Sequence, residues 1–390
     1  MKRYWIIGVV VAFIWACSSD GDQPNGMTDD VGTTDDDGGA MDDDVTSVTF
    51  DRSAMLANWA DNIIIPAYNE FLVAYADFQS AYDTFRTGRT EENLVVLRTE
   101  WLDAYKSWQR VSMFEIGPAE EDGLRLNINT YPTDIELLEA FVINDNYDFS
   151  LPSNRDVKGF PALDYLINGL AETDTEIVVL YTTDITGDAY LEYFRDVISD
   201  IEARVVSVLD DWNAGYRDTF VNNDGSSATA SVDRFVNDFI FYYEKFLRAG
   251  KMGIPLGVFT GTVAPQTLES FYRDGVGNEL FLEGLDAVQD FFNGKHFNSS
   301  DTGESLASYL RTLNTVKDGA ALDEVINGQF NLARDMVASL DAFRLEIEES
   351  TPPTDMLLAY DEVQKAVPLL KVDMVSAMSI AIDFVDADGD

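Results

Sequence analysis

The stretch FLVAYADFQSAYDTF, Phe71 to Phe85, decides the fold of this chain. Its aromatic residues recur at spacings of three and four, at Phe71, Tyr75, Phe78, Tyr82 and Phe85. This spacing places every ring on one face of an α-helix, so it predicts an amphipathic helix with a buried aromatic stripe. We interpret the stripe as protein core and not as a haem-binding surface.

The same stripe extends towards the N-terminus through Leu56, Trp59 and Ile63. Pro66 interrupts it, and a proline inside a helix removes a backbone hydrogen bond, so we expect a kink or a split there. Gly88 follows the last aromatic residue and predicts the end of the helix.

Similar periodicity predicts helices along most of the remaining chain. We place them at about 90–114, 135–142, 189–212, 231–248, 267–292, 322–348 and 354–384. Thr133 is the expected cap of the short helix at 135–142, and Pro368 is expected to bend the helix at 354–384. Residues 175–183 are rich in β-branched side chains and are the best strand candidate, although their context favours a short helix or an edge segment.

These elements predict an all-α fold, and helices of this length favour up-down bundles. The polar segment NNDGSSATAS, residues 222–231, is expected to be a linker. It would separate a first bundle, 49–221, from a second bundle, 232–390.

The N-terminus has the pattern of an export signal. Two basic residues precede an apolar run that is short for a membrane span, so residues 1–16 are predicted to be a signal peptide. The run ends in IWAC, which resembles a bacterial lipobox and implies cleavage before Cys17 and lipidation of that residue. The alternative is a plain signal peptide with an incidental cysteine.

Residues 17–48 are rich in Asp, Gly, Thr and Ser and poor in large apolar groups, which predicts a flexible acidic tether. Acidic residues soon after a lipidated cysteine resemble the surface-export signal of some Bacteroidota-type lipoproteins. That resemblance implies a cell-envelope location, on the outer membrane and exposed at its outer face, with the lipid on Cys17 as the link to the membrane.

The charge balance restricts the partners. The chain has 70 acidic and 26 basic residues, a net charge of −44. Such a surface repels nucleic acid and anionic lipid headgroups, so we expect no nucleic-acid partner. It would attract cations, metal ions included, although we favour the interpretation that the acidity serves only solubility and surface exposure.

A single cysteine and a single histidine restrict the chemistry further. Cys17 excludes a disulfide within the chain, and the two residues together are too few for a Cys/His zinc site. His296 lies in FFNGKHFNSSDTG, a polar stretch that predicts a loop.

Five segments, in this order, resemble the imelysin family of helical bacterial envelope proteins. They are WLDAYKSWQRVSMFEIGP at 101–118, RLNINTYPTD at 125–134, VKGFPALDYLINGL at 157–170, PQTLESFYRDGVGNEL at 265–280 and VPLLKVDMVSAMSIAIDFVDADGD at 367–390. The resemblance covers nearly all of the chain after Thr46. It implies two helical bundles packed into one body and a link to iron or haem acquisition, and peptidase activity has also been attributed to the family.

The family motif Gly-x-His-x-x-Glu is altered in this chain. Gly159 matches its glycine, but Pro161 stands at the histidine position and Asp164 at the glutamate position. Residues three apart share a helix face, so the parent pair could bind one metal ion, whereas Pro161 has no ligating atom. Hydrolysis by a zinc ion needs about three protein ligands, and His296 is the single imidazole of the chain. A zinc peptidase site is therefore implausible.

An all-oxygen site for iron or another hard cation, such as calcium or magnesium, remains open. The candidate donors are Asp164, Glu115, Asp134 and Glu269. The C-terminal DADGD resembles the opening of a calcium loop but lacks the distal glutamate that such a loop needs.

Five further residues in these segments are candidates for ligand binding: Arg125, Asn127, Gly159, Tyr165 and Ser270. Structural roles compete with this interpretation. Arg125 and Asn127 could stabilise a loop, Asp164 and Tyr165 could be polar helix positions that face solvent, Glu115 could be structural, and Glu269 and Ser270 could cap a helix.

The leading hypothesis is a non-catalytic binding or accessory lipoprotein that is linked to iron or haem acquisition. A metal-dependent peptidase is the first alternative. The second is a surface adaptor for an outer-membrane receptor.

Overall fold

The computed structural model describes residues 50–382. The predicted signal peptide, the lipidation site Cys17, the acidic tether and the DADGD end lie outside these residues. All of the described residues belong to one compact unit. Only the arrangement inside this unit is described.

The aromatic stripe lies on a long helical segment, as predicted. The segment consists of α1 (Arg52–Asn58), the π-helical turn η1 (Trp59–Ile64) and α2 (Ile65–Thr87). Its five rings are all buried. Pro66 lies in the first turn of α2, directly after the π-helical turn, where its missing N–H is easily accommodated.

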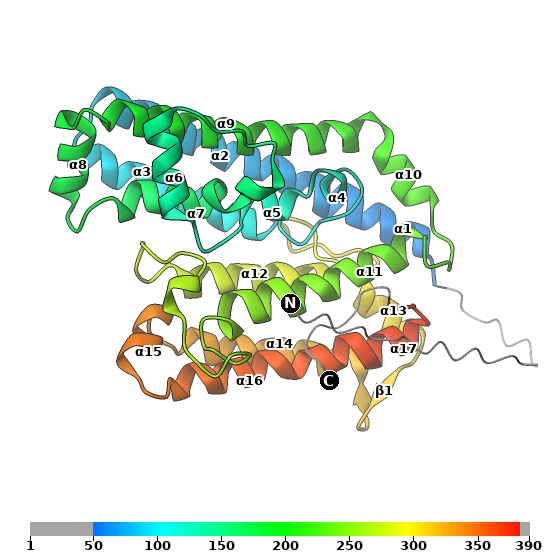
Figure 1. Cartoon of the computed structure of the whole chain (residues 1–390). Helices are drawn as coiled ribbons and strands as arrows, with labels where there is room; N and C mark the ends of the chain where they lie inside the picture. Colours follow the sequence, from blue (N-terminus) through cyan, green and yellow to red (C-terminus); the bar gives the residue numbers. More distant parts are fainter. Residues whose placement is uncertain (1–49, 383–390) are drawn as a thin grey trace, which may run out of the picture. The chain divides into compact units, whose positions relative to one another are not determined.

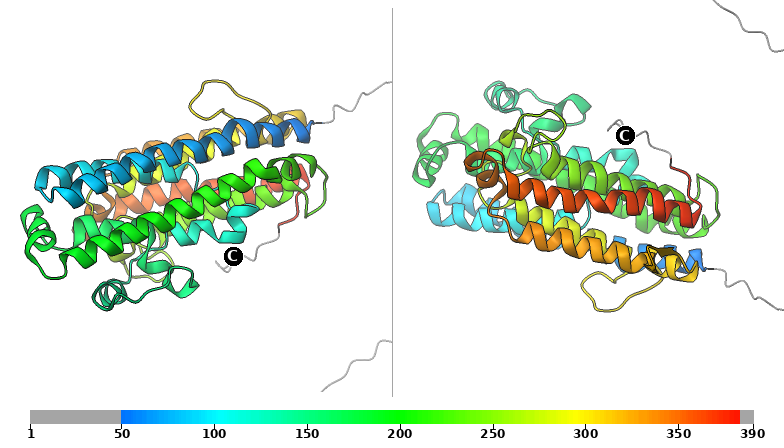
Figure 2. Two further views of the ribbon diagram at one scale, coloured as in Figure 1. Left: turned by 90° about the horizontal axis from the view of Figure 1, so that it is seen from above. Right: turned by 90° about the horizontal axis from the view of Figure 1, so that it is seen from below.

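The first helix group runs from α1 to α10. Around α2 pack the long helices α3 (Glu91–Gln109) and α9 (Gly187–Asp211), and Figure 2 shows α2 and α9 running alongside one another. The shorter elements of the group are α4 (Pro118–Asp122), α5 (Leu124–Ile128), α6 (Ile135–Asn144), η2 (Pro152–Val157), α7 (Gly159–Asp164), η3 (Tyr165–Gly169), α8 (Asp174–Thr183), η4 (Trp212–Tyr216) and α10 (Arg217–Asn222).

The second helix group runs from α11 to α17. It contains α11 (Ser231–Phe241), which continues into η5 (Tyr242–Gly253), then η6 (Pro265–Thr267), α12 (Gly277–Phe292), α13 (Leu306–Thr312), α14 (Leu322–Ala338), α15 (Phe343–Glu349), α16 (Thr354–Pro368), η7 (Leu369–Met374) and α17 (Val375–Met378). A short antiparallel hairpin, β1 (Val316–Lys317) with β2 (Ala320–Ala321), precedes α14.

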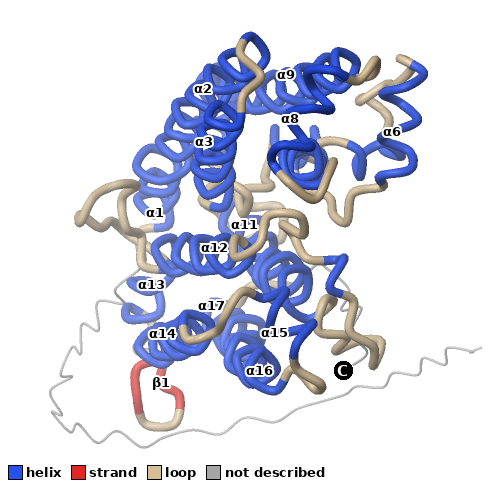
Figure 3. Tube along the Cα trace, turned by 90° about the vertical axis from the view of Figure 1, so that its left-hand side faces the viewer, coloured by secondary structure: helices blue, strands red, loops and turns tan. Residues whose placement is uncertain are grey.

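The two groups share one core. Helix α3 packs against α12, and α12 packs in turn against α14 and η5 (Figure 1). Figure 3 shows α11, α12, α14 and α16 gathered beneath the helices of the first group, with the hairpin at their edge. The all-α prediction is confirmed for the described residues, whereas the domain boundary at 222–231 stays a prediction.

Several predicted boundaries are wrong. The helix expected at 90–114 ends at Gln109, because residues 110–114 turn away. The helix expected at 322–348 is divided into α14 and α15. For residues 175–183 the short-helix alternative is confirmed, since they lie in α8, which Thr173 caps with a capping box. Asp134, not Thr133, caps α6.

The largest error is the helix expected at 267–292, which begins only at Gly277. The residues before it, 254–276, form an irregular segment that contains only the short turn η6. Its hydrogen bonds to the first helix group, described below, replace those of a helix. Within residues 50–382, no helix is long and apolar enough to span a bilayer.

Candidate functional site

Gly159 opens the altered motif, and its conformation explains why glycine is needed there. Its φ of +76° is one that side-chain-bearing residues rarely adopt. A Cβ at this position would lie 2.1 Å from the carbonyl oxygen of Ile128. Gly159 was predicted as a site residue, and the structure gives it a structural reason: it lets α7 approach the end of α5.

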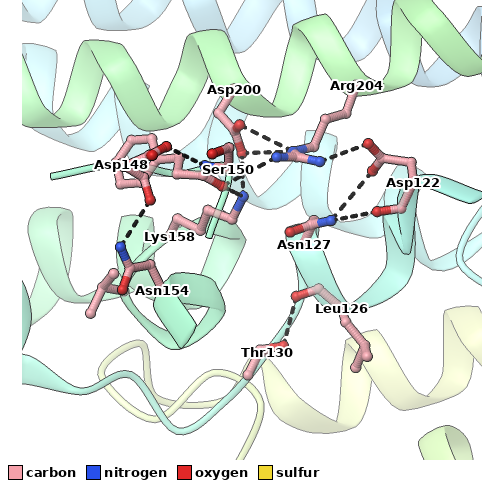
Figure 4. Close-up of polar contacts among 12 residues, drawn as sticks. Asp122, Leu126, Asn127, Thr130, Asp148, Ser150, Asn154, Lys158, Asp200 and Arg204 are labelled. Carbon is pink, nitrogen blue, oxygen red and sulfur yellow. Dashed lines mark hydrogen bonds and ion pairs between the residues drawn. The ribbon is translucent and has the colours of Figure 1, made fainter. Parts of the chain in front are cut away.

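Lys158, the neighbour of Gly159, is fully buried and fastens the motif to α9. Its Nζ donates to the Phe149 carbonyl at 2.7 Å and to Asp200 Oδ2 at 2.9 Å. Figure 4 shows Arg204 between Asp200 and Asp122, donating to Asp122 Oδ1 at 2.7 Å. Two cations and two carboxylates therefore neutralise each other here.

Asn127 contacts the same group of charged residues through Asp122. Its side-chain amide donates to the Asp122 carbonyl at 2.7 Å, and the residue is buried (Figure 4). These contacts agree with the interpretation that Asn127 stabilises the local backbone. Asp134 also makes a local contact, because its carboxylate accepts from Leu137 N at 3.0 Å as the cap of α6.

Asp164, at the end of α7, does not face solvent. It is 1% exposed, and its Oδ1 accepts from the Asn168 amide at 2.9 Å. Its Oδ2 accepts from the backbone N–H of Tyr272 at 2.9 Å and from Ser270 Oγ at 3.4 Å. Burial raises the pKa of Asp164 to about 7, and these hydrogen bonds oppose the rise.

Tyr165, the next residue, is also buried. Its hydroxyl donates to Glu139 Oε1 of α6 at 2.5 Å, and its ring lies 5.2 Å from that of Tyr272. Burial, and then the hydrogen bond to Glu139, raise the pKa of Tyr165 far above its ordinary value. Tyr165 thus holds α6 and the 254–276 segment against the motif.

Glu269 lies in the same irregular segment and reaches into the first helix group. Its Oε1 accepts from the Gln109 amide at 3.0 Å and from the Asn129 amide at 2.7 Å. Its Oε2 pairs with the ammonium of Lys251 from η5. Glu269 is 3% exposed, so these donors compensate a carboxylate that water barely reaches.

Lys251 is buried with Glu269. Its Nζ also donates to Gln109 Oε1 at 2.8 Å, and Asn129 accepts from the Tyr105 hydroxyl at 2.5 Å. Burial lowers the pKa of Lys251, and the charge of Glu269 opposes this. We call Asp164, Glu269 and their donors the closed network. The helix-capping interpretation of Glu269 and Ser270 is wrong, since neither residue begins a helix.

The closed network does not fit a resident metal ion. Asp164 and Glu269 line the same small cavity with Pro161, but its volume of about 20 Å³ holds about one water molecule. A metal ion would have to displace Lys251 from Glu269 and the amide donors from both carboxylates. Within the described residues, no group of three or more His, Cys, Asp or Glu side chains is arranged to hold a metal ion. Of the four predicted oxygen donors, Asp164 and Glu269 share this cavity, whereas Glu115 lies beside another cavity and Asp134 caps α6.

Glu115 and Arg125 lie elsewhere, beside a cavity of about 290 Å³ between the two helix groups. Arg125 is buried and donates from Nη2 to both oxygens of Asp238 at 3.1 Å, and from Nε to the Ser112 carbonyl at 2.6 Å. Its guanidinium carbon lies 4.6 Å from the ring centroid of Phe246. We call this space the Glu115 cavity.

The two carboxyls of the Glu115 cavity are both perturbed. Burial raises the pKa of Glu115 to about 7, with Arg125 opposing, and raises the pKa of Asp238 to about 6, again against Arg125. Glu115 Oε2 accepts from the backbone N–H of Arg125 at 2.9 Å. The backbone N–H of Glu115 donates to Asp238 Oδ2 at 3.0 Å, so the three residues form one cluster.

Sequence reasoning missed four residues that complete these sites: Gln109, Asn129, Lys251 and Asp238. Lys251 carried a signal, because it is a charged residue inside the glycine-rich apolar stretch AGKMGIPLG. The other three carried none, because each meets a partner that is more than 100 residues away in the sequence. His296 lies in a loop, as predicted, and joins neither site.

Comparison with known proteins identifies relatives of the chain. Iron-regulated protein A of Synechococcus elongatus is 25% identical over 138 residues, which is 34% of this chain and 37% of that protein. The match thus spans little more than a third of the length of this curated relative.

Two solved structures share the fold. One is a candidate iron-regulated protein A precursor from Parabacteroides distasonis ATCC 8503, with a TM-score of 0.66, 15% identity and coverage of 83% of this chain and 95% of that chain. The other is an imelysin-like protein from Psychrobacter arcticum 273-4, with a TM-score of 0.63, 15% identity and coverage of 85% and 97%. The family model for imelysin (Peptidase_M75) matches residues 64–370. Because that match covers well over half of the chain, this protein belongs to the imelysin family.

Proposed function

We propose that this chain is a non-catalytic binding or accessory lipoprotein of the cell envelope that serves iron or haem acquisition. The observation that carries the proposal is the closed network. The carboxylates of Asp164 and Glu269, at the positions of the family motif segments, are engaged by internal donors and by Lys251. Pro161 stands where the motif has its histidine. A peptidase would need a metal-bound water in an open position, and this arrangement offers no such position.

The link to iron is supported by the names of the relatives. The curated relative from Synechococcus elongatus is called iron-regulated protein A, and the structural neighbour from Parabacteroides distasonis is described as a precursor of such a protein. The word precursor agrees with an exported protein. Anchoring through a lipid on Cys17, placement on the outer membrane and a receptor as partner belong to the proposal on the basis of the sequence.

A peptidase assay tests the central claim. The full chain, purified in detergent, is incubated with a peptide panel, with and without added zinc or ferrous iron. We expect no cleavage above that of Asp164→Ala, with Asp134→Ala as a control outside the closed network. Metal-stimulated cleavage that disappears in Asp164→Ala and persists in Asp134→Ala would favour the peptidase alternative.

A second experiment separates binding from an adaptor role. The same protein preparation is titrated calorimetrically with ferric iron and with haem. In parallel, the transcript of its gene is measured in iron-limited and iron-replete cells. Saturable binding together with induction by iron limitation supports a binding component. Induction without binding, with an outer-membrane receptor that co-purifies, supports the adaptor alternative. An equal transcript level in iron-limited and iron-replete cells would contradict the proposed role in iron acquisition.

A further inference from the structure

The Glu115 cavity is a solvent-accessible space to which both helix groups contribute polar side chains, and nothing in the proposed function uses it. Its polar wall comes from Glu115, Arg125 and Asp238. Its apolar wall comes from Ile116, Leu126, Phe241 and Phe246. At about 290 Å³ it has the size of a small-ligand site.

The charges of the cavity are not balanced. Arg125 already has a countercharge, because its Nη2 donates to Asp238, its Nε donates to the Ser112 carbonyl, and the rings of Phe246 and Tyr242 lie against it. Asp238 therefore neutralises the charge of the guanidinium, which weakens its attraction for an anionic ligand. At the rim, Glu120 and Arg234 are about half exposed and neutralise each other in an ion pair.

Glu115 is the group that remains without a countercharge of its own. Among the described residues, its side chain accepts one hydrogen bond, from the backbone N–H of Arg125 to Oε2. The other oxygen, Oε1, accepts no hydrogen bond from residues 50–382. A half-buried carboxylate with a vacant acceptor is stabilised most by a cation that also donates hydrogen bonds.

We propose that the Glu115 cavity binds a small organic ammonium ion, a primary or secondary amine with an apolar body. The ammonium group donates to Glu115 Oε1, and the apolar body lies against Ile116, Leu126 and Phe241. This differs from a metal site, because Asp238 is already held by Arg125 and only one carboxylate is left to receive the ligand. The site is independent of the iron-linked proposal, so each can fail without the other.

The titration of Glu115 gives the site a signature. Arg125 on α5 lowers the pKa of Glu115, whereas Asp238 on α11 and Asp122 on α4 add to the rise that burial causes. Arg234 and Glu120 at the rim are paired with each other. Because the pKa of Glu115 is about 7, a bound ammonium ion should drive off the proton that a fraction of the molecules carries at neutral pH.

Calorimetry on the full chain in detergent tests the proposal, with phenethylamine as the probe. Phenethyl alcohol is the neutral counterpart with the same ring. We expect saturable binding of the amine, at least tenfold weaker binding of the alcohol, and release of protons on amine binding at neutral pH. Proton release is read from the difference between two buffers of unlike ionisation enthalpy.

Two variants and one control locate the binding. Glu115→Gln keeps the shape of the side chain, removes its charge and should weaken phenethylamine binding about tenfold or more while abolishing proton release. Glu121→Gln is the matched control, since Glu121 is an exposed residue of α4 that does not line the cavity. If Glu115→Gln fails to fold, Leu126→Trp fills the cavity from its exposed rim and should abolish binding with Glu115 intact.

Three results would overturn the inference. They are amine binding that Glu115→Gln and Leu126→Trp leave unchanged, equal affinity for the alcohol and the amine, and the absence of saturable binding of phenethylamine.

Discussion

The closed network and the Glu115 cavity both bring carboxylates between the two helix groups, but their solvation differs. In the closed network, Asp164 and Glu269 receive amide, backbone and ammonium donors, and about 20 Å³ of space remains. Beside Glu115 the space is about 290 Å³, and one carboxylate oxygen has no donor in the described part of the chain. A segment that resembles a family motif can thus be structural, while less conspicuous residues form the cavity.

The largest expected effect concerns the glycine that positions the closed network. Gly159→Ala places a methyl group 2.1 Å from the Ile128 carbonyl oxygen at a positive φ, so α7 must move. We expect a loss of about 4 kcal/mol or more in the free energy of unfolding, measured by urea denaturation.

Gly328→Ala is the control for this effect. Gly328 is an exposed residue of α14, and a Cβ there would meet no atom within 4 Å. We expect a gain of about 0.5 to 1 kcal/mol, because alanine favours the helix. Equal effects of the two substitutions would contradict the structural role of Gly159.

The next effect concerns the ammonium ion inside the closed network. Lys251→Met leaves the carboxylate of Glu269 buried without its countercharge, and we expect a loss of about 3 to 5 kcal/mol in unfolding free energy. Lys106→Met removes the exposed pair with Glu279 and should cost less than about 1 kcal/mol.

A double variant separates the charge from the packing. Lys251→Met with Glu269→Gln removes both charges, so it should recover part of the loss caused by Lys251→Met alone. A double variant that is less stable than Lys251→Met by the full cost of Glu269→Gln would mean that the two residues are not coupled.

The pH dependence of stability offers a third test. The pKa of Asp164 is about 7 in the folded protein and about 4 in an unfolded chain, so between these values the folded state binds more protons. The stabilisation from this group is fully present below about pH 4 and is lost as the pH rises to 7. Asp164→Asn should flatten this fall by up to roughly 1 kcal/mol per pH unit.

Urea midpoints measured across this pH window check the prediction. Glu115 and Asp238 titrate with the same sign, because burial raises the pKa of both carboxyls. In Asp164→Asn, the loss of stability with rising pH should therefore be reduced and not eliminated. Identical pH profiles for the variant and the parent chain would contradict the burial of Asp164.

The smallest effect concerns a residue outside both regions. Asp134→Ala removes the cap of α6 and should cost about 1 kcal/mol in unfolding free energy. Phenethylamine binding, measured calorimetrically, should not change. A large change in binding would mean that α6 is coupled to the Glu115 cavity.

The predicted helices were found where the periodicity was strong. The aromatic stripe of α2 repeats along a continuous helix, so its buried face follows from local spacing alone. The helix predicted at 267–292 failed at its beginning for a tertiary reason. The side chain of Glu269 and the backbone of Tyr272 bond to the first helix group, and an irregular segment makes these contacts.

For the sites, the sequence supplied several residues but not their partners. The resemblance directed attention to Asp164, Glu269, Glu115 and Arg125, all of which lie in one of the two regions. It could not separate these regions, because all four residues occur in segments of the same family pattern. It also grouped Asp134 with them, although Asp134 caps a helix.

The sequence by itself determined the helical class, the core faces of the long helices and the absence of a Cys/His metal set, because these depend on composition and local periodicity. The tertiary structure decided that the carboxylates of Asp164 and Glu269 are hydrogen-bonded inside the closed network and that Glu115 lines a cavity. Glu269 finds its amide donors 160 and 140 residues away, at Gln109 and Asn129. Only the packing of the two helix groups brings such groups together, since burial and pairing of polar side chains are properties of the fold and not of sequence neighbours.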